Sequence, residues 1–257
     1  MLILCVLTPV AHAQPLSAGD LVGRLQQTRA VNIEAVVQKQ FTEVAAARGF
    51  RVTDPYRGQA ADIVERWYQA PTSKSEVCAI LFTDAERIAY DLRGFASPAA
   101  ASVAGFTVTH QGRCGTCSTL RDLAVYLSTP DLTTPARHCA RRIGLERKKR
   151  CFEEEIGLTP WCAESWAYNA DNTRDECLGT CMADYGFFNL LLGRYPGSNA
   201  DASGQLRPCL QCDEEKSGPG FKYSAGRTRR NSGIESAITR PGSELFKVDH
   251  GAYFGEK

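Results

Sequence analysis

The chain has 257 residues, of which 43% are hydrophobic and 23% are charged, and its 30 Lys and Arg against 29 Asp and Glu leave a net charge of +1. This composition excludes a disordered chain, a collagen and a coiled coil. The charge balance excludes a global electrostatic attraction to nucleic acid or to membranes. Eleven cysteines are unusual for this length and are the main indication of function.

The first residues have the pattern of an export signal. An apolar run over residues 1–10 is followed by Ala11-His12-Ala13, which fits a small-x-small cleavage pattern. We expect residues 1–13 to be a signal peptide, residues 14–257 to be a single cysteine-rich domain, and the protein to be secreted. No later run reaches about 18 uninterrupted apolar residues, so no membrane insertion is expected.

Cleavage after Ala13 removes Cys5 and leaves ten cysteines. An even number in an exported chain predicts a disulfide framework, although spacing alone does not give the connectivity. The ten are Cys78, Cys114, Cys117, Cys139, Cys151, Cys162, Cys177, Cys181, Cys209 and Cys212.

The pattern of apolar residues predicts helices in the first part of the chain and strands after them. Asn32 is an expected N-cap of a helix with apolar residues at helical spacing, with Arg48 and Gly49 at its end. A second helix is expected over residues 59–69. Residues 76–83, 87–95 and 105–110 are rich in β-branched and aromatic residues, which predicts an antiparallel β-meander. Residues 97–102 form either a loop or a short helix.

The rest of the chain is predicted to be helical, with loops between the helices. Helices are expected over residues 118–127, capped by Ser118 or Thr119, and over the basic segment 137–150, which two flanking cysteines staple. Thr159-Pro160 predicts the start of a long helix that ends near residue 183. Loops are expected at residues 193–204, 218–220 and 240–242. The predicted fold class is α+β, mostly helical, with a small antiparallel meander in the first half and disulfide staples.

A first candidate catalytic segment follows the last strand and contains His110, Cys114 and Cys117. A thiol at a helix N-terminus loses its proton more easily, and a nearby imidazole can act as its base. Residues 114–117 resemble the Cys-Gly-x-Cys motif of thioredoxin-like proteins over these four residues only, and the surrounding elements differ. The alternative is that the two cysteines form structural disulfides.

A second segment, Cys209-Leu-Gln-Cys212, gives a second CxxC pair. Together with Cys114 and Cys117 it offers four thiolates, which is the ligand set of a tetrahedral zinc site. Because oxidation competes with metal binding, disulfides are preferred over zinc, and zinc over a redox dithiol. We therefore expect no cofactor, with zinc as the alternative.

A third segment concentrates arginines between two glycines. Guanidinium groups bind carboxylate or phosphate in a bidentate manner, so this segment predicts an anion pocket. The alternative is a solvated loop that pairs with the acidic residues 213–215. Nucleic acid is not an expected partner, because few aromatic residues alternate with the arginines. The expected substrate-binding residues are Arg227, Arg229, Arg230, Asn231 and Ser232.

These segments favour a secreted enzyme acting on a small anionic substrate that bears a carboxylate or a phosphate. The reaction class and the oligomeric state are not predicted. The alternatives are a non-catalytic, disulfide-stabilised extracellular binding protein and a zinc-structured domain. The enzyme hypothesis requires His110 and Arg229 to line one cavity.

Overall fold

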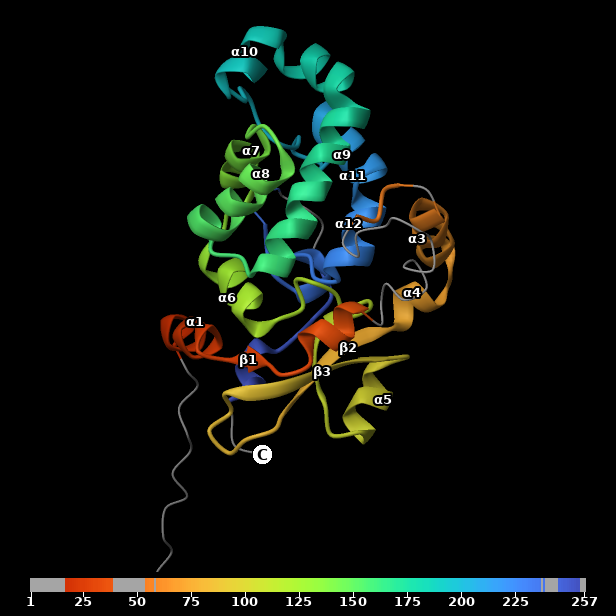
Figure 1. The fold of residues 1–257 in the computed structure, drawn as a ribbon, viewed down its shortest axis with the longest axis vertical. Helices are drawn as coiled ribbons and strands as arrows, with labels where there is room; N and C mark the ends of the chain where they lie inside the picture. Colours follow the sequence, from red (N-terminus) through yellow and green to blue (C-terminus); the bar gives the residue numbers. More distant parts are fainter. Residues whose placement is uncertain (1–16, 39–53, 58, 237, 239–244, 255–257) are drawn as a thin grey trace, which may run out of the picture.

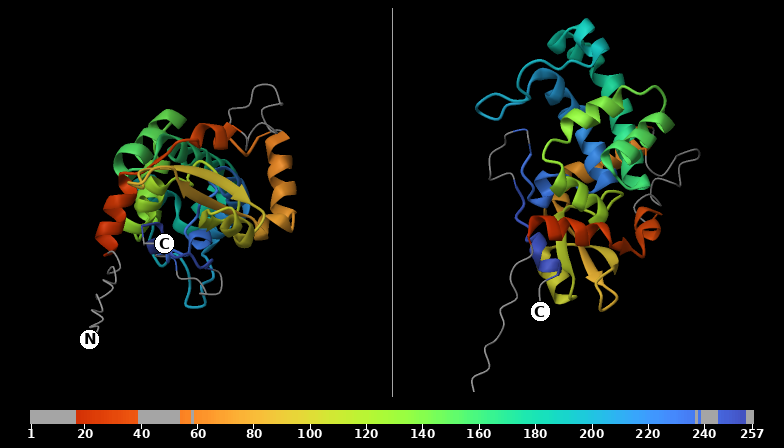
Figure 2. Two further views of the ribbon diagram at one scale, coloured as in Figure 1. Left: turned by 90° about the horizontal axis from the view of Figure 1, so that it is seen from below. Right: turned by 90° about the vertical axis from the view of Figure 1, so that its left-hand side faces the viewer.

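The computed structural model describes residues 17–38, 54–57, 59–236, 238 and 245–254. A small sheet lies toward one end of the long axis, and a group of helices extends from it toward the other end (Figure 1). Figure 2 shows the same arrangement from two further directions. The predicted α+β class, mostly helical with a small sheet, is confirmed.

The sheet has four strands in the order β1-β3-β2-β4. Strands β2 (Val77–Phe82), β3 (Ala89–Phe95) and β4 (Thr107–Gln111) pair in antiparallel fashion, as predicted. The prediction of a purely antiparallel meander is wrong, because β1 (Arg29–Ala30) pairs with β3 in parallel. Asn32 explains this pairing. Its side-chain amide donates to Leu92 O and accepts from Leu92 N, both at 2.9 Å, as a neighbouring strand would.

Short helices flank the sheet. Helix α1 (Ala18–Gln26) precedes β1, and residues 33–38 are helical, while the predicted helix end at Arg48 and Gly49 lies outside the described residues. Helix α3 (Gln59–Gln69) has the predicted bounds, and α4 (Thr72–Ser75) follows it. The segment predicted as a loop or a short helix forms α5 (Pro98–Val103).

Helix α6 (Leu120–Ser128) follows the sheet, and the basic segment after it forms two helices instead of the predicted one. Helix α6 is capped by the Thr119 hydroxyl, which accepts from Asp122 N at 3.1 Å. Helices α7 (Thr133–Ala140) and α8 (Leu145–Cys151) then follow. Residues 141–144 separate them, and Gly144, directly before α8, has a φ of 87°, which a helix interior does not allow. The expected staple is present, because Cys139 and Cys151 form a disulfide.

The long helix α9 (Pro160–Tyr185) begins at the predicted residue and packs against α8, α11 and α12. Helices α10 (Phe187–Leu192), α11 (Pro208–Lys216) and α12 (Gly218–Ala225) follow it. The prediction of a loop at residues 218–220 is wrong, because α12 begins there. Pro219 stands at a first-turn position, where its missing N–H costs nothing.

All ten predicted cysteines are paired, which confirms the disulfide framework. Because disulfides persist in oxidising compartments, five of them indicate an extracellular, disulfide-stabilised protein. The predicted signal peptide lies outside the described residues. In the described part of the chain, no helix is long and apolar enough to cross a membrane. The pairs are Cys78–Cys114, Cys117–Cys162, Cys139–Cys151, Cys177–Cys212 and Cys181–Cys209.

Candidate functional site

The predicted catalytic cysteines are both engaged in disulfides. Cys114 is bonded to Cys78 and Cys117 to Cys162, so neither sulfur carries a thiolate in this structure. This corrects the expectation of a nucleophile at these positions. The zinc alternative meets the same obstacle, because the sulfurs of Cys209 and Cys212 are bonded as well.

His110 lies in the interior and holds the turn that follows β4. Its Nε2 is 2.8 Å from the Ser118 hydroxyl, and its Nδ1 is 2.9 Å from Gln111 O. Complete burial lowers the pKa of His110 well below its usual value, and the Arg227 charge lowers it further. A neutral imidazole with both nitrogens in contact with protein groups positions the turn and faces no cavity described below.

Arg227 is also completely buried. Its guanidinium donates to Thr109 O at 3.2 Å, Thr109 Oγ1 at 2.6 Å and Cys117 O at 3.1 Å. Two further bonds reach Ser118 O at 3.2 Å and Ser232 Oγ at 3.1 Å. Arg227 and Ser232 were expected to bind substrate, but they connect β4, the following turn and the arginine-rich loop.

Asn231 ties this loop to the same turn. Its side-chain amide donates to Gln111 O and Gly226 O, both at 2.7 Å, and its side-chain oxygen accepts from Thr228 N at 2.7 Å. These three bonds use the polar groups of the side chain. The role of Asn231 is therefore to shape the loop that carries Arg229 and Arg230.

Arg229 and Arg230 line a cavity of about 200 Å³ between α9, α11, α12 and the loop after α12, which we call the α9–α12 cavity. His110 is not among its lining residues, so the sequence-based requirement that His110 and Arg229 share one cavity is not met. The lining residues are Trp166, Asn169, Asp213, Glu214, Gly218, Phe221, Lys222, Thr228, Arg229, Arg230, Ser236 and Ile238.

One carboxylate in this cavity serves two cations. Glu214 Oε1 lies 3.3 Å from Lys222 Nζ and also accepts from Arg230 Nη2. Among these three described side chains, one negative charge thus faces two positive charges. The expected alternative, in which the arginines pair with residues 213–215, is correct for Arg230 alone.

Arg229 adds a further positive charge. Among the residues that the structure describes, no carboxylate forms an ion pair with Arg229, and its burial lowers the pKa of the guanidinium. The side chain is held by three main-chain carbonyls, which orient it without neutralising it. These belong to Tyr126, Thr129 and Glu235.

Asp213 differs from Glu214 in its surroundings. Burial raises the pKa of the Asp213 carboxyl, and the neighbouring Glu214 charge raises it too, while a hydrogen bond from the Thr173 hydroxyl acts in the opposite direction. Even with Asp213 ionised, three cations face two carboxylates. Counted over its described residues, the cavity lining therefore carries a net positive charge in either state of Asp213.

Two aromatic rings form an apolar wall beside these charges. The ring centroids of Trp166 and Phe221 are 4.9 Å apart, and the rings meet edge to face at 69°. Trp166 belongs to α9 and Phe221 to α12, so the wall is made by two helices that meet only in the tertiary structure. Trp166 packs on Phe152 and also lines the cavity.

A second cavity of about 400 Å³ lies between α3 and α12 and is lined by Ile63, Arg66, Trp67, Arg113 and Tyr223. The Arg113 guanidinium packs over the Tyr223 ring at 4.3 Å from its centroid. The indole N–H of Trp67 donates to Glu76 Oε1 at 2.7 Å. This cavity provides a control for ligand experiments on the α9–α12 cavity.

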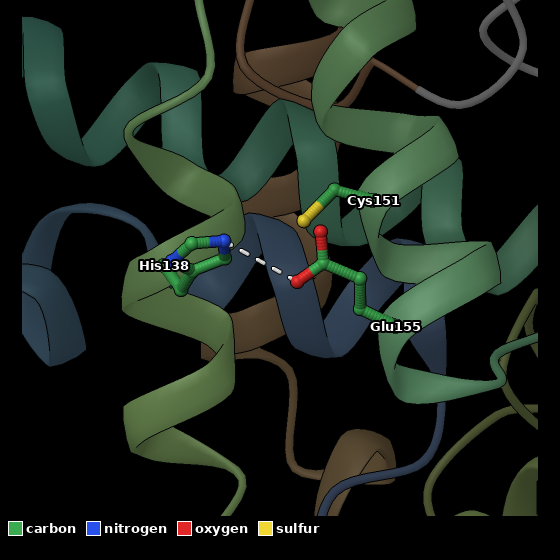
Figure 3. A group of neighbouring side chains, drawn as sticks. All are labelled: His138, Cys151 and Glu155. Atoms are coloured by element: carbon green, nitrogen blue, oxygen red, sulfur yellow. Dashed lines mark ion pairs between the residues drawn. The ribbon is translucent and has the colours of Figure 1, made fainter.

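A cluster with metal-ligand residue types lies on α7, on α8 and on the π-helical segment Phe152–Ile156 that continues α8 (Figure 3). His138 Nε2 is 3.3 Å from Glu155 Oε2, and Arg142 Nη2 is 3.0 Å from that nitrogen and 3.1 Å from Glu155 Oε1. The third member, Cys151, is bonded to Cys139. The Cys151 sulfur is already bonded, and the Arg142 guanidinium pairs with the carboxylate that would bind a metal. We therefore interpret the group as a surface ion-pair cluster.

Sequence reasoning found two residues of the α9–α12 cavity, Arg229 and Arg230, from the density of arginines between glycines. It missed Trp166, Asn169, Asp213, Glu214 and Lys222 as site residues. The only local signal was that Lys222 lies four residues before Gly226, where the arginine-rich segment begins. The others reach the cavity because α11 and α12 pack on α9, which no spacing in the sequence reveals.

The sequence model of a family of unknown function (DUF8771) matches residues 145–248. The matched segment contains every residue that lines the α9–α12 cavity, although it covers less than half of the chain. Comparison with curated proteins gave no match, and comparison with solved structures gave none.

Proposed function

We propose that this extracellular, disulfide-stabilised protein binds a small anionic ligand, bearing a carboxylate or a phosphate, in the α9–α12 cavity. The supporting observation is the charge of the lining. Lys222, Arg229 and Arg230 face one cavity, and the carboxylate of Glu214 is shared between two of them. A partly enclosed surplus of positive charge attracts an anion more strongly than an exposed one, because water screens it less.

The cavity also limits the rest of the ligand. Its volume of about 200 Å³ is below the range of drug-sized pockets, which favours a small metabolite. The edge-to-face pair of Trp166 and Phe221 offers an apolar surface beside the cations. The favoured ligand thus has one anionic group next to a small ring or another apolar part.

Titration calorimetry with three probes tests this proposal. Phenyl phosphate carries both features, inorganic phosphate only the charge, and phenol only the ring. We expect phenyl phosphate to bind most tightly and phenol most weakly, with affinity falling as salt rises. Trp166 provides an independent signal, because a ligand beside its indole changes the fluorescence.

Substitutions of opposite expected sign make the test specific. R230Q and K222Q each remove a cation and should weaken phenyl phosphate binding about 10-fold, while E214Q frees both cations and should strengthen it. R66Q, in the second cavity, is the control and should leave the affinity unchanged. Loss of binding in R66Q with retention in R230Q, or no binding of any anion, would refute the proposal.

An enzyme acting on the same anion is a second candidate, supported by the contrast between two neighbouring carboxyl groups. Burial raises the pKa of Asp213, whereas two cations surround Glu214, and such pairs often supply an acid and a base. His110, Cys114 and Cys117 do not support catalysis in this cavity. If Asp213 is the proton donor, D213N should bind the ligand as tightly as the wild type does but should not convert it. NMR of the ligand measures this turnover. Equal turnover by D213N would reject this role.

A further inference from the structure

Helix α10 exposes nearly all of its apolar side chains. Of its six residues none is buried, and the exposed fractions are 58% for Phe187, 75% for Phe188, 61% for Leu191 and 57% for Leu192. We call these four side chains the apolar tip. Figure 1 shows α10 beyond the end of α9, at the end of the molecule opposite the sheet, and the right-hand view of Figure 2 agrees.

The apolar tip is held in place by the structure beneath it. The Asn189 side chain donates to Tyr185 O at 2.8 Å, which fixes α10 to the end of α9. Gly186 and Gly193, with φ values of 86° and 68°, form the sharp turns at its two ends. Two disulfides, Cys177–Cys212 and Cys181–Cys209, bind this end of α9 to α11. The tip is therefore a fixed protrusion.

Two arginines adjoin the tip. Arg141 Nη2 donates to Leu191 O at 2.8 Å, and the exposed Arg194 follows α10 directly in the chain. Within the described ranges, neither side chain forms an ion pair with a carboxylate. The chain as a whole carries a net charge of only +1, but this end of the molecule places positive charge beside a protruding apolar surface.

We propose that the apolar tip is an anchor for the surface of a membrane that contains anionic lipids. The four side chains enter the boundary between headgroups and acyl chains, and Arg141 and Arg194 contact the lipid phosphates. Interfacial helices combine these features, with aromatic and leucine side chains on the lipid side and basic residues beside them. Such binding lies on the membrane and requires no spanning helix.

The size of the tip favours a lipid surface over a second copy of the chain. At the stated exposures the four side chains offer roughly 450 Å². A stable protein interface buries about 800 Å² on each partner. A narrow protrusion also fits a fluid surface, which closes around it, better than a flat partner.

Vesicle flotation of the full-length protein with intact disulfides tests the anchor. We expect binding to phosphatidylcholine vesicles that contain phosphatidylglycerol, and weaker binding to vesicles of phosphatidylcholine alone. F187S/F188S should lower the partition coefficient at least about 10-fold on both vesicle types. R141Q/R194Q should weaken binding only to the anionic vesicles, and added salt should have the same effect.

Val103 provides the matched control, because it is 92% exposed and lies on α5, at the sheet end of the molecule (Figure 1). V103S removes an exposed apolar side chain away from the tip and should bind vesicles as the wild type does. Equal binding by F187S/F188S and wild type, or no vesicle binding at all, would refute the anchor. A concentration-dependent dimer in light scattering that F187S/F188S abolishes would assign the tip to a second copy instead. Phenyl phosphate binding by F187S/F188S reports on the α9–α12 cavity separately.

Discussion

Three arginines within four residues have three different roles. Arg227 is buried and binds five protein acceptors, Arg229 is oriented by main-chain carbonyls, and Arg230 pairs with Glu214. The sequence shows that the guanidinium groups are concentrated, but their directions depend on the turn at Gly226, whose φ is 71°. Residue type alone therefore predicted Arg229 and Arg230, which line the cavity, together with Arg227, which is buried and is not among the lining residues.

His250 gives the protein a pH dependence with a defined sign. Its Nε2 is 2.7 Å from Ser232 O and its Nδ1 is 2.8 Å from the Tyr253 hydroxyl. Burial lowers the pKa of His250 from 6.5 to about 4, and the Arg227 charge contributes to this shift. Between these values the unfolded chain binds a proton that the folded protein does not, so the free energy of unfolding falls as the pH falls from 6.5 to about 4.

We predict that H250Q removes this contribution, which amounts to about 3 kcal/mol between pH 7 and pH 4. Urea unfolding of wild type and H250Q at a series of pH values measures it. At pH 8 both side chains are neutral, so the difference there reports only the lost packing and hydrogen bonds. Acid limbs that run parallel in the two proteins would contradict the assignment to His250.

At the scale of elements, the helices and strands were predicted best where periodicity was strong. Strands β2 to β4 and helices α3, α6 and α9 lie close to the predicted ranges. Helix α11 was missed because it has no buried residue and hence no apolar stripe. The α7–α8 break was missed because Gly144 within a basic run has the same local signal as a tolerated helix glycine.

A close backbone contact joins the turn after β4 to the end of α12. Thr116 N donates to Ser224 O and Cys117 N donates to Ala225 O, both at 2.9 Å. A Cβ on Gly115 would lie 2.3 Å from Ser224 O. Because that neighbour is backbone, any side chain at this position must separate the two segments.

We predict that G115A lowers the free energy of unfolding by about 3 kcal/mol, through overpacking and the loss of these hydrogen bonds. Chemical denaturation measures the change. The matched control is G179A, because a Cβ there meets nothing within 4 Å and the residue is exposed within α9. Alanine is the better helix former by up to about 1 kcal/mol, so G179A should stabilise the protein. A G115A variant as stable as the wild type would show that the segments can separate at little cost.

For the molecule as a whole, the sequence predicted how many cysteines pair but not which ones. CxxC spacing places Cys114 beside Cys117, yet each bonds to a residue from another element, and the same holds for Cys209 and Cys212. Connectivity depends on which elements pack together, and so does the α9–α12 cavity. Both follow from tertiary contacts that a single sequence does not encode locally.

The five disulfides divide into two groups by their surroundings. Cys78–Cys114, Cys117–Cys162 and Cys139–Cys151 lie in the main hydrophobic core. Cys177–Cys212 and Cys181–Cys209 belong to a separate cluster, in which Cys209 and Cys212 are only partly buried. A reductant must reach the sulfur that it attacks, so the second group should be reduced first.

We predict a two-stage reduction of the native protein. Under mild reductant with iodoacetamide, intact mass should first show four labelled cysteines, and peptide mapping should place them at α9 and α11. The other six should be labelled only in denaturant. Bridges that close loops of 35 and 28 residues each stabilise the fold by about 4 kcal/mol in the chain-entropy account, so α11 should loosen at the first stage.

This first stage should also abolish anion binding, because α11 forms one wall of the α9–α12 cavity and these two bridges hold it against α9. The strands should remain intact, since β2 stays bonded to the turn after β4 through Cys78 and Cys114. Hydrogen exchange separates the two regions by faster exchange in α11 with unchanged protection in β2 and β3. Simultaneous labelling of all ten cysteines would mean that the helical end and the core unfold as one unit, and that the two bridges on α11 have no independent role in holding the cavity.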